Sequence, residues 1–112
     1  MADVGTMTPK QIFEERIGPR LASDPAKSKA INAIYQFDIT GDNGGTWTVD
    51  LTQPAVVSGA GGKAQCTITM NSKDFVDIIT EKLNPQMAFL QGRLKVAGDM
   101  SLALKLGTIL KG

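Results

Sequence analysis

The chain has 112 residues, 42% of them apolar and 21% charged, a composition typical of one globular domain rather than a disordered segment. Its 12 basic and 11 acidic residues nearly cancel, so the chain lacks the positive field that drives binding to nucleic acids. The single cysteine, Cys66, excludes an intramolecular disulfide, and the alternation around it predicts a small buried side chain in a strand.

Two helices are predicted near the start of the chain. Thr8 and Gln11 have the spacing of a capping box, and a proline occupies the first helical position between them. Gly18–Pro19 is expected to bend or stop this helix, because a proline disfavours helical geometry in the residue before it. A second, short helix should begin at Asp24–Pro25 and run to about Ile31.

Four segments then alternate between apolar and polar residues, which is the pattern of strands with one covered and one solvated face. They are residues 35–39, 47–51, 55–58 and 64–70. The first two flank Gly41–Gly45, a run of Gly, Asn and Asp residues, and so predict a β-hairpin.

The next part of the chain predicts helices that cover this sheet. Asn71 is expected to cap a helix whose apolar stripe runs to Leu83. Asn84 should cap another helix, and Gly92 should end it in the left-handed conformation. Alternation at residues 94–96 then predicts a fifth strand.

A last helix is predicted over residues 100–110, with Asp99 as its cap. Leu102 and Leu104 lie on nearly opposite sides of such a helix, so it is apolar over most of its circumference. Three interpretations stay open for this pattern: burial in the core, one wall of a lipid-filled cavity, or a dimer interface.

The element order predicts an α+β fold in a single domain, residues 1–112, with a five-stranded, mostly antiparallel sheet covered on one face by helices. No apolar run approaches the roughly 20 residues of a membrane span, and the first residues lack the pattern of a signal peptide. The last residues, Leu110–Gly112, do not match a peroxisomal address. We therefore expect a cytoplasmic protein.

Side chains that could carry chemistry are scarce. The chain has no histidine, so the thiol of Cys66 has no such base beside it and the commonest metal ligand is missing. Asp74, Asp77 and Glu81 share one helix face and are interpreted as a solvated stripe. Gly59–Lys63 lacks the spacing of a phosphate-binding loop and is interpreted as a connection between strands. We expect a binding protein rather than an enzyme, with no catalytic residue, metal site or cofactor.

Four stretches form a longer pattern than any of these motifs: GTWTVD at 45–50, CTITM at 66–70, NPQMAFLQGRLKVAG at 84–98 and MSLALKL at 100–106. Together they resemble the sterol carrier protein 2 family. The resemblance implies a five-stranded sheet with about five helices on one face, enclosing an apolar tunnel. It implies an intracellular lipid-binding and transfer protein that carries fatty acids, fatty acyl-CoA, sterols or phospholipids.

Apolar side chains of the sheet and the later helices are the candidates to line this tunnel, since apolar contacts alone can hold a lipid chain. They are Trp47, Val49, Phe75, Ile79, Leu83, Met87, Leu90, Met100, Leu102, Ala103 and Leu106. Gln91 is the candidate donor to a lipid headgroup, although a surface glutamine or a helix cap explains it as well.

Two other functions remain as alternatives to lipid carriage. One is an interaction module that dimerises through the apolar C-terminal helix, and the other is an enzyme of unrecognised type. The expected partners are a lipid ligand and no nucleic acid, with transient contact with a membrane left open, and the expected oligomeric state is a monomer.

Overall fold

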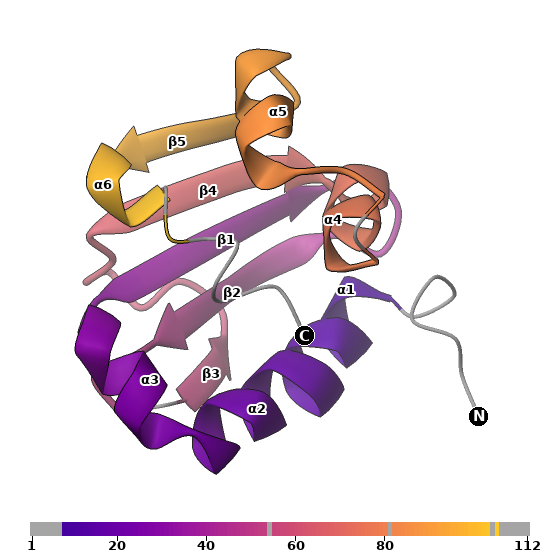
Figure 1. Ribbon diagram of the computed structural model, residues 1–112. Coiled ribbons are helices and arrows are strands. Elements are labelled where there is room, and N and C mark those ends of the chain that lie inside the picture. Colours follow the sequence, from indigo (N-terminus) through magenta and orange to yellow (C-terminus); the bar gives the residue numbers. More distant parts are fainter. Residues whose placement is uncertain (1–7, 54, 81, 104, 106–112) are drawn as a thin grey trace.

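A computed structural model describes residues 8–53, 55–80, 82–103 and 105 of the chain, and it contains a five-stranded sheet in the order β3-β2-β1-β4-β5 (Figure 1). The central pair β1–β4 is parallel, and the other neighbouring pairs are antiparallel. The strands are β1 (Ile34–Thr40), β2 (Gly45–Asp50), β3 (Ala55–Ser58), β4 (Cys66–Asn71) and β5 (Leu94–Gly98). The predicted α+β fold with a mostly antiparallel sheet is confirmed.

The helices pack over one face of this sheet and along its β5 edge (Figure 1). In the described part of the chain they are α1 (Pro9–Gln11), the π-helical η2 (Ile12–Ile17), α2 (Gly18–Ser23), α3 (Pro25–Ile31), α4 (Ser72–Ile79), α5 (Pro85–Leu90) and α6 (Met100–Ala103). The last helix was predicted to reach residue 110, and residues 104 and 106–110 lie outside the described part.

The hairpin β1–β2 forms where the alternation predicted it. Tyr35, Phe37 and Ile39 are buried, whereas the residues between them are only partly buried. Phe37 lies opposite Trp47 in the register, which places two aromatic side chains side by side on the covered face. Asn43 has a positive φ of 57° in the turn, a conformation that asparagine tolerates better than most residues.

The first helix does not stop at Gly18–Pro19, so of the two predicted outcomes, a bend or a stop, the stop is wrong. Helical geometry continues from α1 through η2 into α2. The N–H of Gly18 donates to the carbonyl of Phe13, five residues back, which is the bond of a π-turn. This wider turn accommodates Pro19, because an added residue relieves the clash of the proline ring with the preceding turn of a regular α-helix.

The predicted helix caps are confirmed at α4, α5 and α6. The side chains of Asn71 and Asn84 each accept a hydrogen bond of 2.8 Å from a backbone N–H in the first helical turn. Gly92 ends α5 with a φ of +76°, and the N–H of Arg93 donates to the carbonyl of Ala88 at 2.9 Å. These local bonds fix where each helix begins or ends.

Candidate functional site

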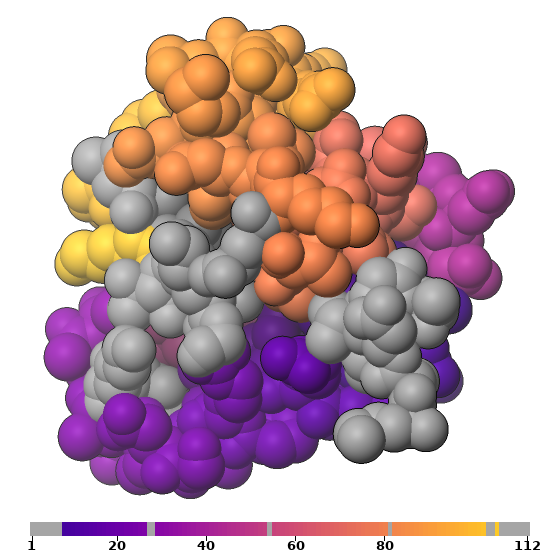
Figure 2. Space-filling view, turned by 45° about the vertical axis from the view of Figure 1, so that its right-hand side comes forward, coloured from indigo at the N-terminus to yellow at the C-terminus, as the bar shows by residue number. Residues whose placement is uncertain are grey.

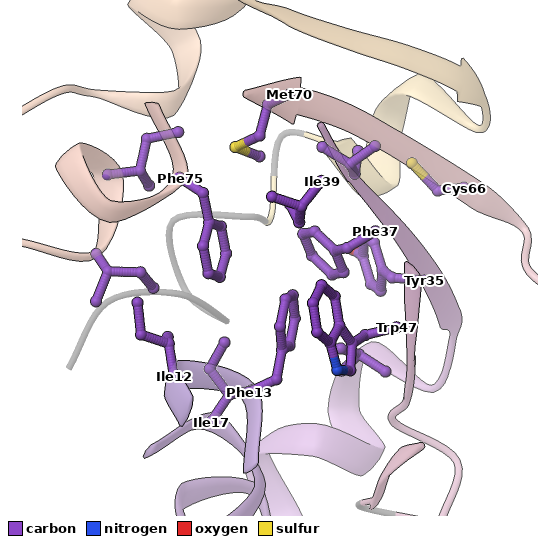
Figure 3. Close-up of a cluster of buried hydrophobic side chains, with 14 of the residues drawn as sticks. Ile12, Phe13, Ile17, Tyr35, Phe37, Ile39, Trp47, Cys66, Met70 and Phe75 are labelled. Atoms are coloured by element: carbon purple, nitrogen blue, oxygen red, sulfur yellow. The ribbon is translucent and has the colours of Figure 1, made fainter. Parts of the chain in front are cut away.

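The interior between the helices and the sheet contains a stack of three aromatic rings (Figure 3). Phe13 of η2 lies between Trp47 of β2, at a centroid distance of 4.8 Å, and Phe75 of α4, at 4.9 Å. Phe37 of β1 meets the Phe13 ring at 5.3 Å and a tilt of 57°. Side chains of β1, β2 and α4 therefore all contact the Phe13 ring of η2, which is fully buried.

The covered face of the sheet surrounds this stack with buried side chains. Beside the aromatic residues, it contributes Ile39, Val49, Cys66, Ile68 and Met70. Each of them follows from the period-two alternation of its strand. The interior therefore consists of aliphatic, aromatic and sulfur-containing side chains. Side chains of these kinds make favourable contacts with the hydrocarbon chain of a lipid.

The hydroxyl of Tyr35 is the polar group that ties the last described helix to the sheet. It is buried and donates a hydrogen bond of 2.6 Å to the backbone carbonyl of Leu102 in α6. Burial raises the pKa of Tyr35, and the charges of Cys66 and Asp99 add to this shift. The hydroxyl therefore remains a neutral donor at physiological pH.

The indole N–H of Trp47 lacks a hydrogen-bond partner within the described part of the chain. Its residue is 5% exposed, so water hardly reaches the group. A buried donor without an acceptor costs about 1–3 kcal/mol, and it is a group that a ligand oxygen could satisfy.

The predicted lining residues divide between the interior and the surface. Trp47, Val49, Phe75, Ile79 and Leu102 are buried, and Leu83 is half-buried against the core. Met87 and Met100 are about half exposed, and Leu90 and Gln91 lie on the surface. The side chain of Ala103 and the whole of Leu106 lie outside the described part.

Leu90 and Gln91 do not face the interior, because of their positions at the end of the short helix α5. Ala88 is the fully buried position of this helix, and two residues further on Leu90 points about 160° away from it. Gln91 is the C-cap residue, and its backbone N–H donates to the carbonyl of Met87 at 2.9 Å. Of the two interpretations of Gln91, the helix end is the one the geometry matches.

Phe13 is the interior residue that the sequence did not single out. Nothing in the local sequence around Phe13 indicates that its ring lies at the centre of the aromatic stack. The contacts with Trp47 and Phe75 join residues far apart in the sequence, and only the tertiary fold brings them together.

Two other kinds of site are absent from the described residues. No group of three His, Cys, Asp or Glu side chains among them is arranged to hold a metal ion. No helix in this part of the chain is long and apolar enough to cross a membrane.

Known proteins similar to this chain include members of one family of lipid-transfer proteins. The sequence model of the SCP-2 sterol transfer family matches residues 14–111. A peroxisomal multifunctional enzyme A from Dictyostelium discoideum is 48% identical over 88 residues, which are 75% of this chain and 20% of that protein. Human sterol carrier protein 2 is 45% identical over 83 residues, 70% of this chain and 15% of that protein. The chain thus spans about a fifth or less of these relatives.

The fold is also that of a solved structure. The solution structure of sterol carrier protein 2 from Aedes aegypti in complex with palmitate superimposes with a TM-score of 0.73 and 27% identity. The match covers 98% of this chain and 96% of that one. The similarity therefore extends over the whole sheet and its helices.

Proposed function

The chain belongs to the SCP-2 sterol transfer family, and we propose that it is a lipid carrier that binds a fatty acid or a related lipid in its apolar interior. The observation that carries the proposal is the interior itself, in which helices and sheet present aromatic, aliphatic and sulfur-containing side chains. A palmitate-bound relative of the same fold supports it. Fatty acyl-CoA, sterols and phospholipids belong to the same ligand class and remain within the proposal.

Burial of the lipid chain supplies the affinity. Each CH₂ group that leaves water contributes about 0.8 kcal/mol, so a long acyl chain needs few polar contacts to be held. Such binding depends little on the detailed shape of the ligand, which favours broad specificity. The chain itself acts in this proposal as a carrier and not as a catalyst.

We place the acyl chain beside the aromatic stack rather than within it. Ring centroids 4.8 and 4.9 Å apart leave no room for an acyl chain between them. Ile79, Leu83 and Met87 follow one another from the end of α4 to α5, and their exposure increases in that order. This gradient supports a path from the surface to the interior.

The remaining proposed lining comes from the sheet, from α4 and from residues 100–106. It comprises Trp47, Val49, Phe75, Met100, Leu102, Ala103 and Leu106. Leu90 and Gln91 are left out, because they lie on the outer surface. The unpartnered indole N–H of Trp47 replaces Gln91 as the proposed donor to a hydroxyl, carbonyl or carboxyl oxygen of the ligand.

Displacement of a fluorescent fatty acid tests the proposal. The full chain should bind the probe and release it on addition of palmitate, and native mass spectrometry should show one lipid per chain. Leu83→Glu should weaken palmitate binding by about ten-fold or more. A carboxylate at this half-buried position loses its hydration when the acyl chain packs against it, and its charge repels the acid group of the ligand.

Val57→Glu is the matched control, because Val57 of β3 is 56% exposed and lies at the opposite edge of the sheet. It should bind palmitate as the wild type does. A dimer that binds no lipid would contradict the proposal and favour dimerisation through the C-terminal helix instead.

The compartment in which the chain acts is part of the proposal. We place it in the cytoplasm, where its single cysteine, Cys66, would stay reduced. A fluorescent fusion of the chain that concentrates in peroxisomes would contradict this placement.

A further inference from the structure

The outer face of α5 is apolar although it is exposed to solvent. Ala88 is fully buried and holds the helix against the molecule. Leu90, Met87 and Phe89 have 76%, 49% and 40% of their surfaces exposed. Three large apolar side chains on a helix of six residues are more than scattered surface residues explain, and such clusters mark interaction sites.

The charged residues from Lys82 to Lys95, the stretch that contains α5, are all basic. Lys82 precedes α5, Arg93 follows it and Lys95 lies in the neighbouring strand β5, and all three are exposed. Between Lys82 and Gly98 the sequence has no acidic residue. An apolar face with basic residues at its borders complements a lipid surface that carries anionic headgroups.

The position of α5 leaves this face accessible. The helix stands on the edge strand β5 and projects from the end of the molecule opposite α2 and α3 (Figure 1). In the space-filling view the same segment, in orange, forms the top of the molecule (Figure 2). Asn84 at its start and Gly92 at its end hold the helix in place, so its outer face is formed before any contact.

We propose that the outer face of α5 docks on membranes that contain anionic lipids, with Leu90, Met87 and Phe89 entering the boundary between headgroups and acyl chains. Lys82 and Arg93 then lie near the phosphate groups, and their long side chains can extend toward them. The inference rests on the proposed carrier function, for which it names the surface that meets the donor or acceptor membrane. Met87 lies both on this face and on the proposed path of the lipid, so the docked orientation brings the entrance to the membrane.

Co-sedimentation with vesicles tests this surface on the full chain. The wild type should bind vesicles of phosphatidylcholine with phosphatidylserine more tightly than vesicles of phosphatidylcholine alone. Leu90→Glu should weaken binding to the mixed vesicles by about ten-fold, since it replaces an inserting side chain by a like charge. Arg93→Glu should weaken it at least about five-fold, the effect of one basic residue near an anionic surface.

Two matched variants separate the surface from general effects of the substitutions. Val57→Glu places the same change on an exposed valine of β3, and Lys63→Glu reverses an exposed charge in the loop before β4. Both should bind mixed vesicles as the wild type does. Circular dichroism and the unfolding midpoint verify the fold of each variant, and Phe89→Gln replaces Leu90→Glu if the latter fails to fold.

The outcomes distinguish this inference from the carrier function. Uptake of a fluorescent fatty acid from solution, without vesicles, reports on the carrier function alone. Normal uptake together with equal vesicle binding by wild type, Leu90→Glu and Arg93→Glu would overturn the docking surface only. A shift of Leu90→Glu from dimer to monomer, with unchanged vesicle binding, would assign the face to a second copy of the chain and overturn it too. Vesicle binding that depends on α5 supports it even if no fatty acid is taken up.

Discussion

Trp47 contributes both its ring and its N–H to the interior. Its position in the alternation of β2 predicts only that the side chain is buried. Its ring closes one side of the aromatic stack, and its N–H is buried without a partner among the described residues. The first role stabilises the fold through apolar contact, whereas the second leaves a hydrogen bond unmade. A ligand oxygen at this N–H would turn a cost of the empty protein into a contribution to binding.

Trp47→Phe is therefore expected to weaken binding of dodecanoic acid by about two- to ten-fold, the range of one hydrogen bond. Binding of dodecane, which has no oxygen, should change less. Both affinities come from competition against the same fluorescent fatty acid. Equal losses for the two ligands would show that the ring matters only through packing.

Cys66 is expected to react slowly as a thiol, because burial raises its pKa to about 11, with a smaller contribution from the charge of Asp99. At pH 8 a disulfide reagent should modify it far more slowly in the folded chain than in urea. The unfolded thiol ionises near its ordinary pKa of about 9, so the free energy of unfolding should fall between about pH 9 and pH 11. Cys66→Ala should show a smaller fall, and the part that remains belongs to Tyr35, whose pKa is also raised.

At the scale of elements, the helix ends were predictable and the π-turn was not. Caps at Asn71, Asn84 and Asp99 depend on hydrogen bonds within a few residues, which the sequence displays directly. The π-turn is associated with packing between distant elements. It occurs in the segment that holds Phe13 between the rings of Trp47 and Phe75. Local rules for Gly18–Pro19 predict a bend or a stop, and the helix does not stop there because its contacts with the sheet and α4 outweigh those rules.

The junction of β5 and α6 should be sensitive to one methyl group. Gly98 has a φ of +100°, and a Cβ there would lie 2.4 Å from the carbonyl oxygen of Gln65. That same carbonyl accepts the N–H of Asp99, the cap of α6, at 3.0 Å. Gly98→Ala should therefore lower the free energy of unfolding by about 2–5 kcal/mol, from backbone strain and steric overlap together.

Gly62→Ala is the control for strain alone, because Gly62 also has a positive φ, +74°, but has open space where its Cβ would lie. It should cost only about 1–2 kcal/mol, and urea denaturation measures both variants. Equal losses in the two variants would mean that the β4–β5 pair shifts to admit the methyl group.

For the whole molecule, each strand was predictable from the sequence, but the pairing of the strands and the residues that line the interior were less predictable. Period-two alternation identifies the buried residues of β1 and β4, since every second side chain points to the helices. It does not say that β1 and β4 are neighbours, nor that they run parallel, because pairing joins segments distant in the chain. The candidate site shows the same limit: apolar character alone did not distinguish the buried Ile79 from the exposed Leu90.

The parallel pairing of β1 with β4 also has a consequence for synthesis of the chain. The β1–β2 hairpin is complete once Asp50 has left the ribosome, but the other edge of β1 has no partner until Asn71 has followed. During that interval the nascent chain presents an open strand edge and the apolar face of Tyr35 and Phe37. We expect self-association to compete with folding in this window, and a chaperone that covers the free edge of β1 to protect the chain.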